Sequence, residues 1–187
     1  MTEPDAQAGG SQHLLDNTGI HAALDRLAEQ IAKRFGEADD LCLIGVRRRG
    51  DVLAGRLRDR LQILLSADIP TGSLDITLYR DDFDSMSRDP IISESDIPFQ
   101  LDGRTVILVD DVIFTGRTVR AALDEILDLG RPDRVALAVL IDRGGRELPI
   151  AADLIGQHVE TADGDEVLVL LNDTDGSDAV ILRRAGD

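Results

Sequence analysis

Apolar residues recur three and four positions apart in three stretches of the chain, which is the spacing of an amphipathic helix. These stretches cover residues 20–35, 52–64 and 119–127. Gly130 follows the third stretch, and glycine is the residue that most often ends a helix. The pattern therefore predicts three helices, each with one face turned toward a hydrophobic core.

Short apolar runs alternate with these helices and predict strands. Residues 41–46, 104–109 and 134–141 are mostly apolar runs typical of buried strands, and residues 74–79 alternate between apolar and polar positions. Strand and helix therefore alternate through residue 141. This order favours an α/β fold in which helices cover both faces of a parallel sheet.

Three regions lack such a pattern. Residues 1–18 are rich in Gly, Gln and Asp and are expected to form a flexible N-terminal tail. Residues 80–103 are polar and contain two prolines, so they are expected to form a flexible lid loop. Residues 142–187 hold short apolar pieces divided by Gly-Asp turns, which predict a small β-rich subregion. We therefore expect one domain over residues 19–187, with its core in residues 19–141.

Composition and charge narrow the class of protein. The 187 residues are 43% hydrophobic and 30% charged, which is typical of a folded globular domain. The net charge of −16, from 36 acidic and 20 basic side chains, opposes general affinity for nucleic acid. Cys42, the single cysteine, cannot form an intramolecular disulfide, so a reducing cytoplasm is the expected compartment. No apolar run reaches the roughly 18 residues that a membrane helix needs.

Several kinds of active site are excluded by motifs that the sequence lacks. The only lysine, Lys33, is followed by arginine, which rules out a Walker phosphate loop. Neither the G-x-G-x-x-G motif of dinucleotide binding nor the G-x-S-x-G motif of hydrolases occurs. The three histidines do not form H-E-x-x-H or another zinc-binding spacing.

The most informative segment is TVILVDDVIFTGRT at residues 105–118. An apolar strand ends in Asp110 and Asp111, and a turn of hydroxyls and glycine at residues 115–118 then opens a helix. Backbone N–H groups at a helix N-terminus favour a phosphate dianion. The two acids repel phosphate and suit ribose hydroxyls or a divalent metal carried by the ligand. The alternative is that this segment has no binding role and is a buried strand that ends in solvated acids before a capped helix. This alternative accounts for single features of the segment, but not for all of them together.

This segment resembles the signature of the type I phosphoribosyltransferases, which bind phosphoribosyl pyrophosphate (PRPP). Three further segments resemble the PyrR family, whose members are pyrimidine-operon regulators and uracil phosphoribosyltransferases. They are IGVRRRG at 44–50, DITLYRDD at 75–82 and DRGGRELPI at 142–150. The resemblance covers roughly residues 18–184. It implies a type I phosphoribosyltransferase fold, with a parallel sheet flanked by helices and a small β-rich hood.

The resemblance also implies the chemistry. Uracil and PRPP would give UMP and pyrophosphate in pyrimidine salvage, with Mg²⁺ carried by PRPP and held near Asp110 and Asp111. A homodimer or a larger homo-oligomer is expected, with no membrane partner.

The resemblance assigns roles to individual residues. The catalytic residues would be Asp110 and Asp111, on the ribose hydroxyls, and Arg80, on the pyrophosphate. The PRPP phosphate would lie against Val112, Ile113, Phe114, Thr115, Gly116, Arg117 and Thr118. The pyrophosphate loop would be Arg47, Arg48, Arg49 and Gly50, and the family usually has a smaller polar residue where Arg48 stands. Asp142 and Arg143 would border the base.

Two alternatives to a uracil phosphoribosyltransferase remain open. The first is an RNA-binding attenuator of pyrimidine genes that responds to UMP and uses the enzyme site as a sensor. RNA binding is possible but disfavoured, because Asp25 and Glu29 are acidic where RNA-binding relatives carry neutral or basic residues. Gly145, Ala151 and Gln157 likewise stand where histidine, arginine and lysine are usual. The second alternative is transfer to another base, such as a purine, which the family-specific segments disfavour.

Overall fold

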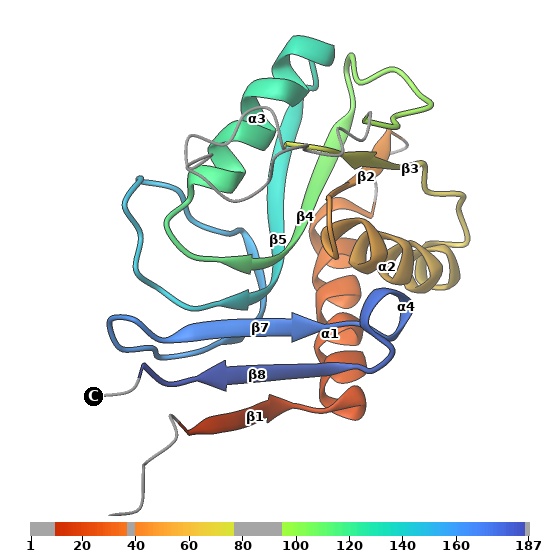
Figure 1. Ribbon diagram of the computed structural model, residues 1–187. Coiled ribbons are helices and arrows are strands. Elements are labelled where there is room, and N and C mark those ends of the chain that lie inside the picture. The colour runs from red at the N-terminus through yellow and green to blue at the C-terminus, as the bar shows by residue number, and fades with distance from the viewer. Residues whose placement is uncertain (1–9, 37–39, 77–94, 186–187) are drawn as a thin grey trace, which may run out of the picture.

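A five-stranded parallel sheet forms the centre of the protein in the computed structural model, which describes residues 10–36, 40–76 and 95–185 (Figure 1). Its strand order is β3-β2-β4-β5-β6, and each neighbouring pair is parallel. The strands are β2 (Leu41–Val46), β3 (Thr71–Leu74), β4 (Thr105–Ile113), β5 (Arg134–Asp142) and β6 (Leu154–His158). The predicted α/β class with a parallel sheet is confirmed.

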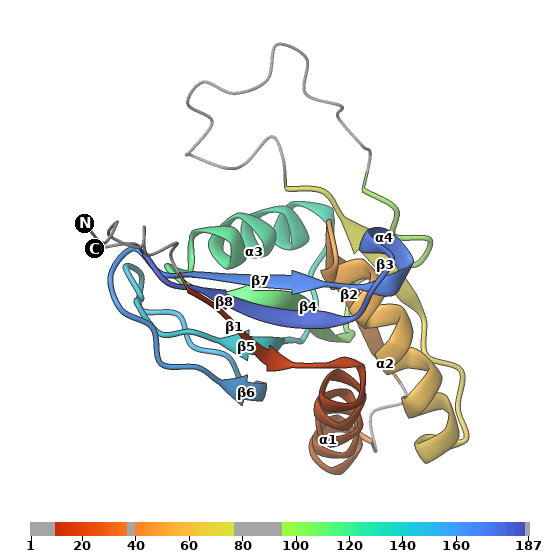
Figure 2. The same cartoon turned by 60° about the horizontal axis from the view of Figure 1, so that its bottom comes forward.

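Three helices cover the two faces of this sheet, as Figure 2 shows. Helices α1 (Asn17–Phe35) and α2 (Gly50–Leu65) pack on one face, and α3 (Arg117–Leu129) packs on the other. Successive residues of β4 serve opposite faces: Ile107 belongs to the core under α1 and α2, and Leu108 to the core under α3. All three helices lie where the apolar spacing predicted them.

A second sheet lies beyond the carboxyl ends of β4 and β5 (Figure 1). It is antiparallel with the order β1-β8-β7, formed by β1 (Ser11–Leu15), β8 (Ala179–Arg183) and β7 (Glu166–Leu170). The short helix α4 (Asn172–Asp175) connects β7 to β8. We call β1, β7, α4 and β8 the hood.

Two expectations about the ends of the chain were wrong in part. Residues 11–15 were assigned to a flexible tail, but they form β1 at the edge of the hood. Only Leu14 and Leu15 of this strand pack against the core, which is too short a stretch to show a period. The β-rich subregion was expected to begin at residue 142, but β6 adds to the parallel sheet beside β5. The core sheet therefore extends to His158.

The middle of the chain also differs from the prediction. The strand predicted over 74–79 was wrong in position, because β3 covers Thr71–Leu74 and residues 75–76 are not in a strand. Residues 77–94 lie outside the described part of the chain. Most of the proposed lid loop, 80–103, falls in that range. Its described end is not a loose loop, because Asp96 pairs with Ser73 and Leu101 is buried in the core.

No helix in the described ranges is long and apolar enough to cross a membrane.

Candidate active site

The end of β4 and the start of α3 are joined by a turn at the N-terminus of the helix. Gly116 precedes the helix with a φ of 92°, in the left-handed region that glycine adopts most readily. The Thr115 hydroxyl accepts a hydrogen bond of 3.3 Å from the Arg117 amide. The first amides of α3 have no carbonyl partner within the helix, so this turn is suited to bind an anion.

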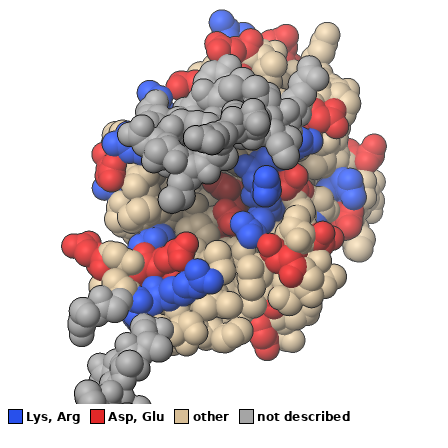
Figure 3. Space-filling model, viewed as in Figure 1, with Lys and Arg blue, Asp and Glu red and all other residues tan. Residues whose placement is uncertain are grey.

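A cleft of about 590 Å³ opens between this turn and the hood. Figure 3 shows acidic and basic side chains close together in a hollow on this side of the molecule. The cleft is lined by Arg49, Asp111, Val112, Ile113, Phe114, Thr115, Gly116, Arg117, Thr118, Val119, Arg143, Glu147, Glu166, Val167, Leu168 and Val169. The loop and strand ends that were predicted separately therefore meet in one cavity.

The two adjacent acids have different surroundings. Asp110 is 4% exposed and accepts a 2.9 Å hydrogen bond from the Asp111 amide. Asp111 is less buried, lines the cleft, and accepts a 2.8 Å bond from the Val112 amide. Burial raises the pKa of Asp111, and the Val112 amide and the nearby Arg49 guanidinium partly offset this. Asp111 is therefore the acid that faces the cleft.

The predicted pyrophosphate loop follows β2 and places one arginine in the cleft. Arg49 has a φ of 72° and donates to Asp175 from Nε at 3.1 Å and from Nη2 at 3.0 Å. A Cβ on Gly50 would lie 2.5 Å from the Val109 carbonyl oxygen, so this position requires glycine. The loop is thus packed directly against the end of β4.

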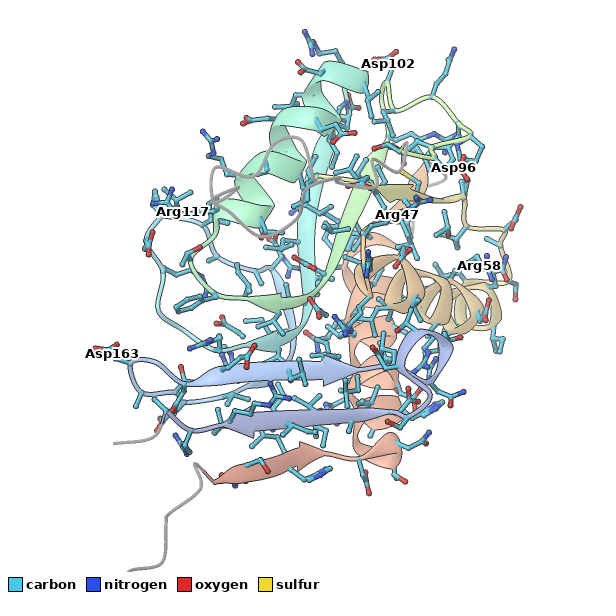
Figure 4. All side chains as sticks on the ribbon, viewed as in Figure 1. Arg47, Arg58, Asp96, Asp102, Arg117 and Asp163 are labelled. Atoms are coloured by element: carbon cyan, nitrogen blue, oxygen red, sulfur yellow. The ribbon has the colours of Figure 1, made fainter. Side chains whose placement is uncertain are left out.

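The other two arginines of this loop do not line the cleft. Arg47 donates to the Ser73 hydroxyl at 3.0 Å and lies beside β3 in Figure 4. The peptide bond between Arg47 and Arg48 is cis.

A fourth arginine, Arg117 at the start of α3, does line the cleft. It pairs with Glu147 at 2.8 Å, and Figure 4 shows it at the edge of the molecule.

The predicted base-site residues lie at the end of β5. Arg143 is 9% exposed, and its Nη2 donates to the Asp165 carbonyl at 2.7 Å. Its guanidinium carbon lies 4.0 Å from the centroid of the Phe114 ring, in a cation–π contact. The Arg143 Nε is buried without a partner in the described ranges. Arg143 therefore connects the turn after β4 to the segment that leads into the hood.

Asp142 lies behind this arginine, in an adjoining pocket that Arg143 also lines. It pairs with Arg146 at 2.7 Å and accepts a 2.9 Å bond from the Gly144 amide. Burial acts to raise the pKa of Asp142, but the Gly144 amide and Arg146 together hold it below its ordinary value.

Not all predicted site residues meet. The cleft brings together Arg49, Asp111, the segment 112–118 and Arg143. The residues that do not line it are Asp110, Arg47, Arg48, Gly50 and Asp142. Arg80 lies outside the described residues.

Sequence reasoning missed four residues of the cleft wall and one residue that contacts the cleft from outside it. Residues 166–169 of β7 form the hood wall, and their mostly apolar sequence carried no chemical signal. Asp175, which binds Arg49, lies in an Asp-rich turn that resembled an ordinary solvated loop.

Comparison with known proteins first defines the class. A family model described as phosphoribosyl transferase domain matches residues 10–170. The hypoxanthine phosphoribosyltransferase of Trypanosoma cruzi superposes with a TM-score of 0.71 at 18% identity, over 94% of this chain and 97% of that chain. A hypoxanthine-guanine phosphoribosyltransferase of Bacillus anthracis gives 0.70 at 16% identity, over 95% and 99%. The fold is that of the type I phosphoribosyltransferases.

Sequence relatives then identify the family. A protein of Deinococcus radiodurans named Bifunctional protein PyrR is 51% identical over 182 residues, which is 97% of this chain and 96% of the relative. One of the same name from Pelotomaculum thermopropionicum is 50% identical over 169 residues, covering 90% and 93%. The chain belongs to the PyrR family of phosphoribosyltransferases.

Proposed function

We propose that the protein is a uracil phosphoribosyltransferase, which converts uracil and PRPP into UMP and pyrophosphate. The observation that carries this proposal is the shared cleft, in which the turn at 115–118, Asp111 and Arg49 face the same cavity. These groups match the three charged or hydroxylated parts of PRPP, namely its 5′-phosphate, its ribose and its pyrophosphate.

The turn before α3 would hold the 5′-phosphate. Its amides and the hydroxyls of Thr115 and Thr118 supply donors, and the positive end of the helix dipole favours the dianion. Side chains of residues 112–114 would line the same part of the cleft.

The acids would hold the ribose and approach the magnesium that PRPP carries. In the described ranges no group of three or more His, Cys, Asp or Glu side chains forms a metal cage. Magnesium bound to a substrate's phosphates commonly takes only one or two protein carboxylates, so Asp111, with Asp110 behind it, fits this role. The metal would neutralise negative charge on the leaving pyrophosphate.

Catalysis would depend on stabilising charge rather than on a protein nucleophile. The bond from the anomeric carbon to pyrophosphate breaks as uracil N1 bonds to that carbon and gives up its proton to solvent, and negative charge grows on the leaving group. The Arg49 guanidinium in the cleft would stabilise that charge. Arg80 would act on the same group, and Arg143 with Asp142 would border the base.

The first prediction is magnesium-dependent synthesis of UMP with a preference for uracil. Purified protein is incubated with PRPP, Mg²⁺ and each nucleobase in turn, and nucleotide formation is followed by chromatography. We expect uracil to give the highest kcat/KM. A clear preference for a purine would overturn the substrate assignment, and no transfer to any base would overturn the enzymatic proposal.

Regulation through pyrimidine leader RNA is a second candidate, favoured by the word bifunctional in the relatives' names. The surface of this chain opposes it. Asp25 on α1 pairs with Arg60 at 2.6 Å, so it neutralises a cation that could contact phosphate. Arg146 is engaged by Asp142 at 2.7 Å and by the Ile150 carbonyl at 3.0 Å.

The second prediction is therefore weak RNA binding at physiological salt. We expect a mobility shift with the leader RNA of its own pyrimidine operon to be absent, or to vanish with modest added salt. The net charge of −16 opposes a polyanion, and Arg60 and Arg146 are already paired with carboxylates. The assay is run with and without UMP across a salt series. Tight binding that UMP strengthens would restore the regulatory role.

A further inference from the structure

The connection between β7 and β8 reaches the N-terminal part of α2 through carboxylates. Asp175 in α4 binds Arg49, which directly precedes α2. Asp173 and Asp178 both bind Arg56, about two turns further along that helix. The Asp178 side chain is only 2% exposed. This part of the hood is therefore fixed to the start of α2 by two arginines.

The Asp175 carboxylate is firmly held in its place. Its Oδ2 accepts a 2.9 Å hydrogen bond from the Leu171 amide and another of 2.9 Å from the Thr174 hydroxyl. Its two oxygens receive the Nε and Nη2 donors of Arg49. The Arg49 hydrogen bond is the largest cause that lowers the pKa of Asp175, to about 2. The carboxylate is thus ionised at every physiological pH.

The pairing restricts how Arg49 can point. A guanidinium carries five N–H donors in a planar fork, and the bonds to Asp175 use one on Nε and one on Nη2. In the contacts that the structure describes, the other three N–H donors of Arg49 remain available for a second anion. An arginine side chain is otherwise long and flexible, so a carboxylate fixed at one edge of the plane determines where the other edge lies.

We propose that Asp175 is a positioning residue for the transfer reaction, because it holds the Arg49 guanidinium in the cleft in the orientation that stabilises the departing pyrophosphate. This inference rests on the proposed function. Asp175 itself touches neither PRPP nor the base in this scheme and acts only through Arg49.

The electrostatics give the proposal a distinctive kinetic signature. Asp175 brings a negative charge toward the pyrophosphate site, so its removal does not weaken the attraction of the cleft for PRPP in the ground state. Removal does free Arg49 from its fixed orientation, which matters most when charge develops on the leaving group. The loss is therefore expected in kcat and not in the KM for PRPP.

The test compares Asp175→Asn with Asp173→Asn. Both variants remove one negative charge from α4, but Asp173 contacts Arg56 and does not reach Arg49. We expect Asp175→Asn to lower kcat about tenfold with an unchanged or lower KM for PRPP, and Asp173→Asn to leave both within twofold. Thermal melts and circular dichroism establish that each variant is folded.

A double variant shows whether Asp175 acts through Arg49. The double variant Arg49→Met with Asp175→Asn is expected to have the same kcat as the single variant Arg49→Met. The proposal is overturned if Asp175→Asn keeps wild-type kcat, raises KM alone, or lowers kcat equally in the Arg49→Met background. If the wild type binds magnesium pyrophosphate in calorimetry but transfers no phosphoribosyl group, the proposed function fails instead.

Discussion

Replacing Asp111 by asparagine is expected to lower the rate of UMP formation by about 10²–10³-fold, the scale seen when one preorganised polar contact to a transition state is lost. Asp111 is the acid that lines the cleft, and asparagine keeps its size and its bond from the Val112 amide. The variant loses only the charge that would hold the ribose and approach magnesium. Initial rates at saturating PRPP, Mg²⁺ and uracil measure the effect.

The same substitution is expected to stabilise the free protein. Burial raises the pKa of Asp111, so its ionised form is disfavoured in the folded state. Below the pKa that Asp111 has in the unfolded chain, both states are protonated and this loss of stability is absent. The loss develops as the pH rises from there through the raised pKa of Asp111 in the folded protein. The unfolding midpoint of Asp111→Asn should therefore exceed that of the wild type at pH 7, and the two should converge below about pH 4.

Asp110→Asn serves as the comparison, since Asp110 is buried and does not line the cleft. We expect a smaller loss of rate from this variant, with the fold intact. Wild-type rates and an unchanged PRPP affinity in both variants would refute the role of these acids on the ribose.

Replacing Arg143 by methionine is expected to raise the KM for uracil at least tenfold while the KM for PRPP stays near that of the wild type. Arg143 reaches the cleft beside Phe114 and is held by the Asp165 carbonyl. Methionine fills a similar volume but donates no hydrogen bond. The Asp165 carbonyl then loses a buried donor, which costs about 1–3 kcal/mol of stability.

Arg184→Met is the matched control, because Arg184 also contacts Asp165, through Oδ2 at 2.7 Å. The Arg184 side chain is 47% exposed and does not line the cleft, so its loss should leave both KM values unchanged. Steady-state kinetics with uracil varied at saturating PRPP, and denaturant unfolding, measure the two effects. An unchanged KM for uracil in Arg143→Met would contradict a base site at this position.

The sequence predicted the helices and the strand-to-helix segment at 105–118, because each of them has a regular pattern within one continuous stretch of chain. The three helices have long apolar faces, and residues 105–118 combine a strand, two acids and a helix start in one continuous segment. Strands β1 and β6 have only five residues each, and few of those are apolar, so pairing with distant strands decides their structure. Such pairing leaves no period in the sequence.

For the candidate site as well, the sequence indicated the loops that contribute to it but not which side chains enter the cleft. Three consecutive arginines could be assigned to a pyrophosphate loop, but the sequence could not show that Arg49 alone enters the cleft. The left-handed backbone of Arg49 and its bond to Asp175 both depend on contacts across the fold. Asp175 lies 126 positions away, in a turn with no motif of its own.

The pairing of β1 with β8 has a consequence for how the chain folds during its synthesis. Ser11 emerges from the ribosome early, whereas its partner Arg183 is made last among the strand residues. The parallel sheet can be completed once β6 has emerged, but β1 has no neighbouring strand until β8 has been made. A nascent chain halted before Ala179 would therefore carry the finished turn at 115–118, the proposed phosphate site, beneath an unclosed hood. Binding of a phosphorylated ligand to such a stalled chain should precede any capacity to enclose a base.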